Sequence, residues 1–301
     1  MAISEARGLP AGIAARPLVA ADIPQAEALA EEAGWNQVAA DWRIFVDFGA
    51  ATALSDAGGR IVATAATLPH GGGFGWISMV LVTAAWRRRG LARWLLAEAV
   101  ATLTGQGLVP LLDATPAGRA VYLGLGFRDA WGVTRLVRPA ASLRAQRGDP
   151  EAADGDAGII IRPLRDDDWP ALAALDQEGF GGQREALLRR LALRLPKGAL
   201  VAERAGRLAG FLLGRDGRVM RQLGPLVAGD EATARALLAH AVGAVPGALA
   251  IDLVDRHDGL GGWLAAQGFA AERPLTRMVL GASGAFADPA RYVAIAGPEL
   301  G

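Results

Sequence analysis

The residues best placed to do chemistry in this chain are three consecutive arginines at positions 87–89, followed directly by Gly90. An apolar stretch rich in β-forming residues precedes them, and residues 91–103 carry leucine and alanine at helical spacing. A loop between a strand and a helix directs free backbone N–H groups and the positive end of a helix dipole toward one point. These residue types at this spacing predict a phosphate-binding loop.

The loop differs from the commonest phosphate-binding motifs, because it has neither GxxxxGK[ST] nor GxGxxG. Instead, its sequence satisfies R-x-x-G-x-[GA] at residues 87–92, shortly after the apolar run VLV at residues 80–82, and this combination resembles the acetyl-coenzyme A motif of the GNAT N-acetyltransferase superfamily. The resemblance implies that acetyl-CoA is the cosubstrate. The residues it implies for binding are Val80, Leu81, Val82, Arg87, Arg88, Arg89, Gly90, Leu91 and Ala92. A surface loop with solvated arginines is the alternative.

A second segment, residues 112–127 with sequence LDATPAGRAVYLGLGF, carries the same resemblance. A strand, a short helix bearing Tyr122, and then Gly126 and Phe127 are similar to the Y-x-x-x-G-F signature of GNAT enzymes. The resemblance implies that Tyr122 protonates the departing thiolate of coenzyme A, which a phenol can do at neutral pH. The alternative is an aromatic side chain that caps the short helix. Gly126 and Phe127 are predicted to be structural.

No motif identifies the base that would keep an acceptor amine neutral for attack on a thioester. The candidates are Asp113, at the end of the strand next to the motif strand, and His70, before a run of three glycines. Glu32 and Asp41 could instead hold a cationic substrate. Each of these four also has a structural alternative. A backbone N–H on the motif strand, near Leu81 or Val82, could stabilise the oxyanion of the intermediate.

The predicted substrate-binding residues are Trp35 and Asn36, in the loop after the first helix, and Trp76, just before the motif strand. Aromatic rings among scattered carboxylates suit a small amine through cation–π contact and charge pairing. A location of the tryptophans in the core is the alternative. Residues 256–258 and 286–300 of the second half are candidate lids over this side.

The chain repeats itself. The tripeptide RPL occurs at 16–18 and at 162–164, each time followed by a helical pattern, and a Gly-Phe pair stands near the end of each half. Two tandem domains with one order of elements, each an α/β mixed sheet, explain this pattern economically. The predicted bounds are 1–142 for a catalytic GNAT domain, 143–158 for a linker and 159–301 for a GNAT-like domain.

The second copy of the motif loop, residues 227–232 with sequence VAGDEA, has lost its positive charge. Asp230 there suits a helix N-cap, and Glu231 suits the first turn. Both would repel a pyrophosphate, and Leu264 stands where the first half has Tyr122. The second domain is therefore predicted to have kept the fold and lost the cofactor site. Such an arrangement resembles bacterial GNAT proteins with a non-catalytic C-terminal domain.

Composition excludes several classes of protein. The chain has 301 residues, 52% of them hydrophobic, a formal net charge of zero, no cysteine and three widely separated histidines. Disulfides, thiolate metal sites and a cysteine nucleophile are excluded, and the histidines have no metal-ligand spacing. There is no basic face for nucleic acid and no apolar run of membrane-spanning length. We expect a cytoplasmic protein, monomeric or homodimeric, without metal, membrane or nucleic-acid partners.

The leading functional prediction is an acyltransferase that moves the acetyl group of acetyl-CoA to a primary amine. The acceptor would be a small molecule, an amino acid or a peptide. Two alternatives stay open. One is a sensor that binds acetyl-CoA without turnover, and the other is a structural or toxin-neutralising partner protein.

Overall fold

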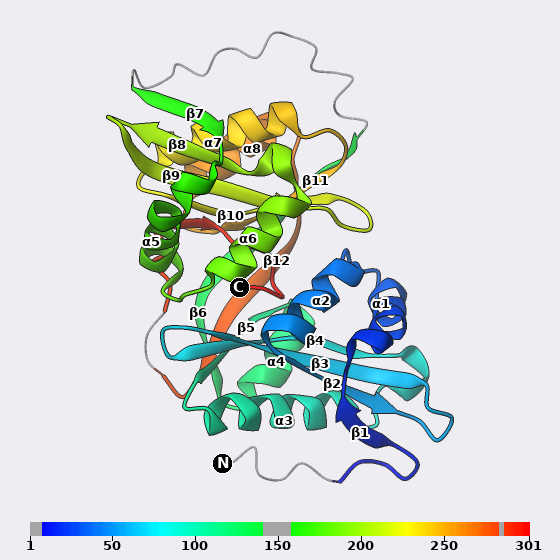
Figure 1. The fold of residues 1–301 in the computed structure, drawn as a ribbon. Helices are drawn as coiled ribbons and strands as arrows, with labels where there is room; N and C mark the ends of the chain where they lie inside the picture. Colours follow the sequence, from blue (N-terminus) through cyan, green and yellow to red (C-terminus); the bar gives the residue numbers. More distant parts are fainter. Residues whose placement is uncertain (1–7, 141–157, 283–285) are drawn as a thin grey trace.

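The computed structural model describes residues 8–140, 158–282 and 286–301, which form one mixed sheet of 13 strands covered by helices (Figure 1). The main elements of the first half are β1 (Ala14–Pro17), α1 (Ile23–Glu32), α2 (Ala39–Phe48), β2 (Ala50–Ser55), β3 (Ile61–His70), β4 (Phe74–Val82), α3 (Leu91–Gly105), β5 (Val109–Ala114), α4 (Pro116–Leu123) and β6 (Phe127–Arg138). Those of the second half are β7 (Ile159–Pro163), α5 (Trp169–Phe180), α6 (Glu185–Arg194), β8 (Leu200–Arg204), β9 (Arg207–Arg215), β10 (Arg221–Ala228), α7 (Glu231–Ala244), β11 (Leu249–Val254), α8 (Asp258–Ala266), β12 (Ala270–Leu280) and β13 (Tyr292–Ala294).

The predicted repeat is confirmed down to single atoms. Arg16 donates two hydrogen bonds of 2.6 and 2.8 Å to the carboxylate of Asp22. At the same place in the second half, Arg162 donates bonds of 2.6 and 2.7 Å to Asp168. Each aspartate also accepts a bond from the backbone N–H three residues before it. The two halves therefore enter their first helix in the same way. The predicted linker, apart from Gly158, lies outside the described residues.

The halves exchange their last long strands. The sheet order around the junction is β5, β12, β6, β11, so that β12 of the second half lies between two strands of the first. Strand β6 in turn has both of its neighbours, β12 and β11, in the second half. Figure 1 shows β12, in orange, crossing toward the strands of the first half. This exchange turns two predicted sheets into one continuous sheet, which the sequence pattern did not anticipate.

Helices cover both faces of the sheet. The buried residues of α3 pack with those of β3, β4 and β5, whereas α1 and α2 share a core cluster with α5 and α6 of the other half. Helices α7 and α8 cover a further cluster in the second half. The helices α2 and α6 and the strand β13 were not predicted. The central core therefore spans the two halves.

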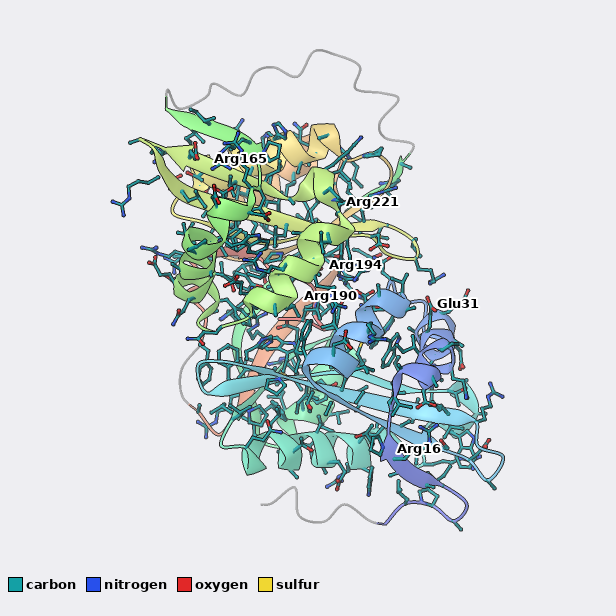
Figure 2. All side chains as sticks on the ribbon, in the orientation of Figure 1. Arg16, Glu31, Arg165, Arg190, Arg194 and Arg221 are labelled. Atoms are coloured by element: carbon teal, nitrogen blue, oxygen red, sulfur yellow. The ribbon has the colours of Figure 1, made fainter. Side chains whose placement is uncertain are left out.

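Buried ion pairs also join the halves. The Asp41 carboxylate on α2 accepts hydrogen bonds of 2.5 Å from Arg194 and 2.9 Å from Arg215. Arg190, one turn before Arg194 on α6 (Figure 2), donates to Asp47, which also lies on α2. Both bonds of Asp41 cross the interface between the halves. The prediction that Asp41 holds a cationic substrate is therefore not supported, because its carboxylate is already paired.

Candidate active site

The predicted strand–loop–helix junction is present, and a cleft opens beside it. Parallel strands β4 and β5 pair only from Phe74 to Trp76 on β4, although β4 continues to Val82. Near the point of separation, Met79 adopts a left-handed φ of 53°, and the register between β3 and β4 shifts. Such a bulge bends a strand and ends pairing on one side. The last third of β4 thus has a free edge toward β5.

The backbone on this free edge is available for hydrogen bonding. The Thr83 N–H donates to the Val62 carbonyl on β3, at 2.9 Å. Because N–H groups alternate in direction along a strand, those of Val82 and Val80 point away from β3 and into the cleft. Of the two residues near which the oxyanion donor was predicted, Leu81 directs its N–H toward β3 and Val82 directs its N–H into the cleft, as Val80 also does. The role of donor stays a prediction.

The loop after β4 ends in an uncapped helix. Gly90, the N-cap residue of α3, has a φ of 85° and no side chain to accept from the first turn, and Arg88 is also left-handed, at 61°. Helix α1 braces the loop from behind, because the Glu32 carboxylate accepts 2.7 Å bonds from Thr83 Oγ1 and from the Ala84 N–H. These bonds lower the pKa of Glu32. Glu32 is therefore a loop brace rather than a free substrate ligand.

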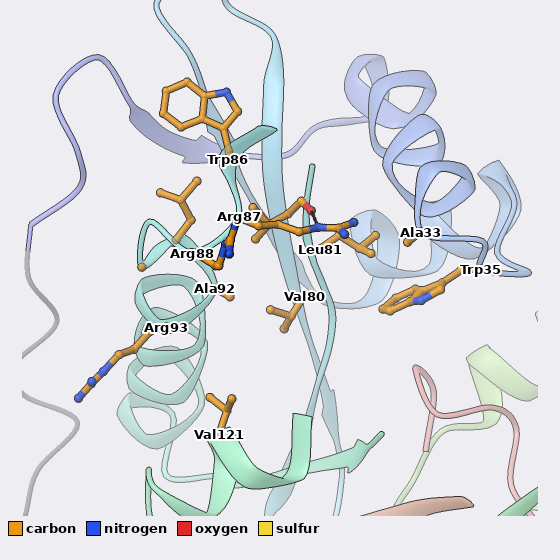
Figure 3. Close-up of a pocket in the computed structure, with 13 residues that line it drawn as sticks. Ala33, Trp35, Val80, Leu81, Trp86, Arg87, Arg88, Ala92, Arg93 and Val121 are labelled. Carbon is orange, nitrogen blue, oxygen red and sulfur yellow. Dashed lines mark hydrogen bonds between the residues drawn. The ribbon is translucent and has the colours of Figure 1, made fainter. Parts of the chain in front are cut away.

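A pocket of about 570 Å³ lies over the cleft, between α3 and the connection from α1 to α2 (Figure 3). Its lining residues are Ala33, Trp35, Val80, Leu81, Val82, Trp86, Arg87, Arg88, Gly90, Leu91, Ala92, Arg93 and Val121. All the predicted cofactor-binding residues except Arg89 are among them. Ala33, Trp86, Arg93 and Val121 were missed; the last two could have been found because each adjoins a predicted site residue along its helix.

The three arginines of the loop have different surroundings. The Arg87 Nε donates to the Val82 carbonyl at 3.0 Å, so this side chain folds back along β4 (Figure 3). The Arg89 guanidinium lies over the ring of Trp86, 4.6 Å from its centre, outside the pocket lining. Within the described residues, neither Arg87 nor Arg88 forms an ion pair. The pocket thus carries positive charge that no ion pair of those residues neutralises, although the nearby Glu32 carboxylate interacts electrostatically with Arg87.

Tyr122 lies beside the pocket. Its ring packs against Phe127, with 5.9 Å between ring centres, and the adjacent Val121 supplies the side chain that lines the pocket. Burial raises the pKa of the Tyr122 hydroxyl, which keeps it protonated at neutral pH. The role of Tyr122 as a proton donor stays a prediction.

The two candidate bases are both occupied elsewhere. The Asp113 carboxylate accepts two 2.9 Å bonds from Arg277, which β12 brings from the second half. Burial raises the pKa of Asp113, and the charge of Arg277 partly offsets this. His70 is enclosed by aromatic rings, with the Phe180 ring centre 4.8 Å away. Neither residue lines the pocket, and this placement does not support a role as general base for either.

The predicted substrate-binding residues separate. Trp35 lines the pocket. Trp76 is fully buried, and its Nε1 donates to the Pro298 carbonyl at 2.9 Å. Asn36 is turned toward the second half, where its amide bonds the backbone of Val219 and Met220. Only Trp35 is therefore placed to contact a ligand in the pocket.

The equivalent cleft of the second half is filled by the chain itself. Strands β10 and β11 pair only from Arg221 to Leu223 on β10, as β4 and β5 do, and β13 then lies between them. Asp230 caps α7, its carboxylate accepting from the Thr233 N–H at 2.8 Å, which confirms the predicted N-cap. The predicted lid at 286–300 thus contributes β13, which fills this cleft instead of covering the pocket.

Comparisons with known proteins agree with this architecture. Residues 41–129 and residues 172–290 each match a family model described as an acetyltransferase (GNAT) domain. The uncharacterized N-acetyltransferase YitH of Bacillus subtilis (strain 168) is 25% identical over 64% of this chain and 65% of its own length. The match thus spans slightly less than two thirds of that relative.

Solved structures share the fold of the whole chain. A putative acetyltransferase from Pyrococcus horikoshii has a TM-score of 0.76 at 18% identity, over 98% of both chains. A tandem GNAT protein from the clavulanic acid biosynthesis pathway has a TM-score of 0.62 at 19% identity, over 90% of this chain and 99% of its own. The chain belongs to the GNAT acetyltransferase family and carries two GNAT domains in tandem. None of the described helices is long and apolar enough to cross a membrane.

Proposed function

We propose that the protein is an acetyl-CoA-dependent N-acetyltransferase whose catalytic site is the pocket of the first half, and that its acceptor is a primary amine of a small molecule, amino acid or peptide. The observation that carries the proposal is the combination, in one pocket, of a free strand edge, an uncapped helix start and two arginines that form no ion pair with the described residues. These features suit a ligand that has phosphates at one end and amides along its length.

The cleft between β10 and β11 in the second half shows what kind of chain such a cleft can hold. There, β13 occupies the equivalent cleft as an extended segment and pairs with β10 and β11. An extended chain that carries amide groups therefore fits such a cleft through backbone hydrogen bonds. The pantetheine arm of acetyl-CoA contains two amides in an extended chain, and the open cleft beside β4 offers it the N–H groups of Val80 and Val82 and the carbonyl of Val80, whereas the Val82 carbonyl accepts from Arg87.

The reaction follows from these groups. The neutral amine attacks the thioester carbon, and a C–N bond forms as the carbonyl oxygen gains negative charge. The Val82 or Val80 N–H stabilises this oxyanion. The C–S bond then breaks, the ammonium group loses its proton to solvent, and the thiolate takes a proton from Tyr122, which solvent restores. Because the candidate carboxylate and imidazole bases are buried elsewhere, water carries the amine proton away.

The test begins with binding. Wild-type protein should bind acetyl-CoA in calorimetry and release thiol when a panel of primary amines is added. Replacing Arg87→Glu and Arg88→Glu together should weaken binding by more than about 100-fold, because two charge-assisted contacts become repulsive. The matched control is Arg60→Glu with Arg128→Glu, which changes the net charge equally at exposed positions outside the pocket lining. Unchanged affinity of the Arg87/Arg88 variant would refute the site.

The same assay addresses catalysis. Tyr122→Phe should lower kcat while the Kd for acetyl-CoA stays close to that of the wild type, because the ring is retained and only the proton donor is lost. If the Tyr122→Phe variant keeps the kcat of the wild type, water and not Tyr122 gives the coenzyme A thiolate its proton. Binding of acetyl-CoA without thiol release for any amine of the panel would favour the alternative function, a non-catalytic sensor.

A further inference from the structure

The connection between α1 and α2, which supplies Trp35 to the pocket, is held by a segment of the second half. Residues 217–220 join β9 to β10 and lie against Trp35 and Asn36. The Arg218 Nε donates to the Trp35 carbonyl at 3.0 Å, and the Arg218 N–H donates to the Asn36 carbonyl at 2.9 Å. Arg218 thus bonds the backbone carbonyls of two consecutive residues that belong to the other half.

The Asn36 amide completes this contact. Its Oδ1 accepts from the Val219 and Met220 N–H groups at 2.8 and 3.0 Å, and its Nδ2 donates to the Met220 carbonyl at 2.8 Å. Both polar atoms of the amide are therefore satisfied by a segment of the other half. The approach is close, because a Cβ on Gly217 would lie 2.2 Å from Asn36 Nδ2.

The position of Trp35 gives this contact a consequence for the pocket. Figure 3 shows Trp35 and Ala33 on one side of the pocket, toward which the Arg87 side chain extends, and Arg88, Ala92 and Arg93 of the α3 end on the other. If phosphates bind at the start of α3 beside Arg88, the opposite end receives the thioester and the acceptor. The indole of Trp35 is then a wall of the acceptor end, and its backbone is anchored from outside the first half.

We infer that the second half, besides having a filled cleft of its own, is a positioning element for the acceptor end of the active site. Asn36 and Arg218 are positioning residues that act through Trp35, and residues 217–220 set where its indole stands. The inference rests on the proposed function, because it assigns the acceptor to the end of the pocket opposite the phosphates. It explains what a GNAT domain without a cofactor loop contributes to catalysis.

The first measurement needs no acceptor. Amide hydrogen exchange is followed over residues 33–38 in the wild type and in the full-length variants Asn36→Ala and Arg218→Ala. Arg218→Ala removes one of these hydrogen bonds and should speed exchange in this segment by about fivefold, since such a bond contributes roughly 1 kcal/mol, and Asn36→Ala, which removes three, should speed it more. Arg207→Ala, at an exposed position on the opposite end of β9, is the matched control. Unchanged exchange in both variants overturns the inference.

The second measurement separates positioning from mere stability. For the amine that the wild type acetylates fastest, Asn36→Ala and Arg218→Ala should lower kcat/KM about tenfold or more, with the Kd for acetyl-CoA within about twofold of the wild type. In a Trp35→Ala background, Arg218→Ala should have no further effect, because the residue through which it acts is gone. Additive losses, or equal losses of acetyl-CoA affinity, would show a general structural role and reject the inference.

The two proposals fail in different ways. If the wild type neither binds acetyl-CoA nor acetylates an amine, the proposed function fails, and with it the assignment of the acceptor end, whatever the exchange data show. If the wild type binds and acetylates but the variants of Asn36 and Arg218 match it in kcat/KM, the proposed function stands and the inference is wrong.

Discussion

Single residues in this protein separate into those that are already paired and those that are free to meet a ligand. Asp113 and Asp41 have the acidic groups that a base or a cation site requires, yet each holds an arginine of the second half. Removing one partner of such a buried pair leaves an uncompensated charge and costs about 3–5 kcal/mol. Loss of activity at these positions would therefore report first on folding. Arg87 and Arg88 have no such partner among the described residues.

His70 gives a prediction about pH. Burial, together with the charges of Arg184 and Arg277, lowers the pKa of His70 well below its usual value. Below about pH 6.5 the unfolded chain therefore takes up a proton that the folded chain does not. The free energy of unfolding should fall as the pH drops from 7.5 to 5.5, and the share of His70 is about 1.4 kcal/mol.

Urea unfolding at the two pH values checks this prediction. His70→Asn should lose about 1.4 kcal/mol less than the wild type over the same interval, even if it is less stable at pH 7.5. The same substitution at the exposed His240 is the matched control. Equal losses in the wild type and in His70→Asn would show that the imidazole is protonated in the folded protein.

How much of the site the sequence predicts depends on whether a residue acts through its backbone and local position or through a distant partner. The motif residues at 80–92 were found because a strand end, a glycine and a helix start are neighbours in sequence. Asn36 and Trp76 were interpreted as ligand contacts, whereas their partners, Met220 and Pro298, are about 180 and 220 residues away. A pattern of neighbouring residues in the sequence cannot predict contacts between residues so far apart.

At the scale of elements, the same junction of two parallel strands is used in two ways. The cleft between β4 and β5 is open to a pocket, whereas β13 fills the cleft between β10 and β11. The charge reversal at Asp230 was visible in the sequence, but β13 was not, because a three-residue strand has no periodicity to recognise. The short helix α2 escaped prediction because no typical N-cap residue precedes it.

The filled cleft predicts the binding stoichiometry. A ligand of the pantetheine type would have to displace β13, break its pairing with two strands and then meet the carboxylate of Asp230 at the start of α7. Calorimetry with acetyl-CoA should therefore give one site per chain, and the Arg87/Arg88 double variant should show no residual site. A second site of comparable affinity in the wild type, or one that persists in the double variant, would contradict this assignment.

At the scale of the whole molecule, the exchange of β6 and β12 decides what counts as a folding unit. Both neighbours of β6 belong to the second half, and both neighbours of β12 belong to the first. A chain cut at the predicted boundary would leave each piece with a long strand that has no partner in its own half, and unpaired strand edges favour aggregation. The repeat in the sequence therefore shows that the two halves have the same order of elements. It does not show that either half folds alone.

The full chain should consequently unfold as one cooperative unit. In scanning calorimetry we expect a single transition with equal calorimetric and van't Hoff enthalpies, because neither half can lose its strands without disrupting the other. A protease site inserted between residues 143 and 157 should yield two pieces that elute together in size-exclusion chromatography, whereas residues 1–142 expressed alone should aggregate. The uncleaved chain with the inserted site is the control. Two separate transitions, or pieces that part after cleavage and stay soluble, would show that the halves fold independently despite the exchanged strands.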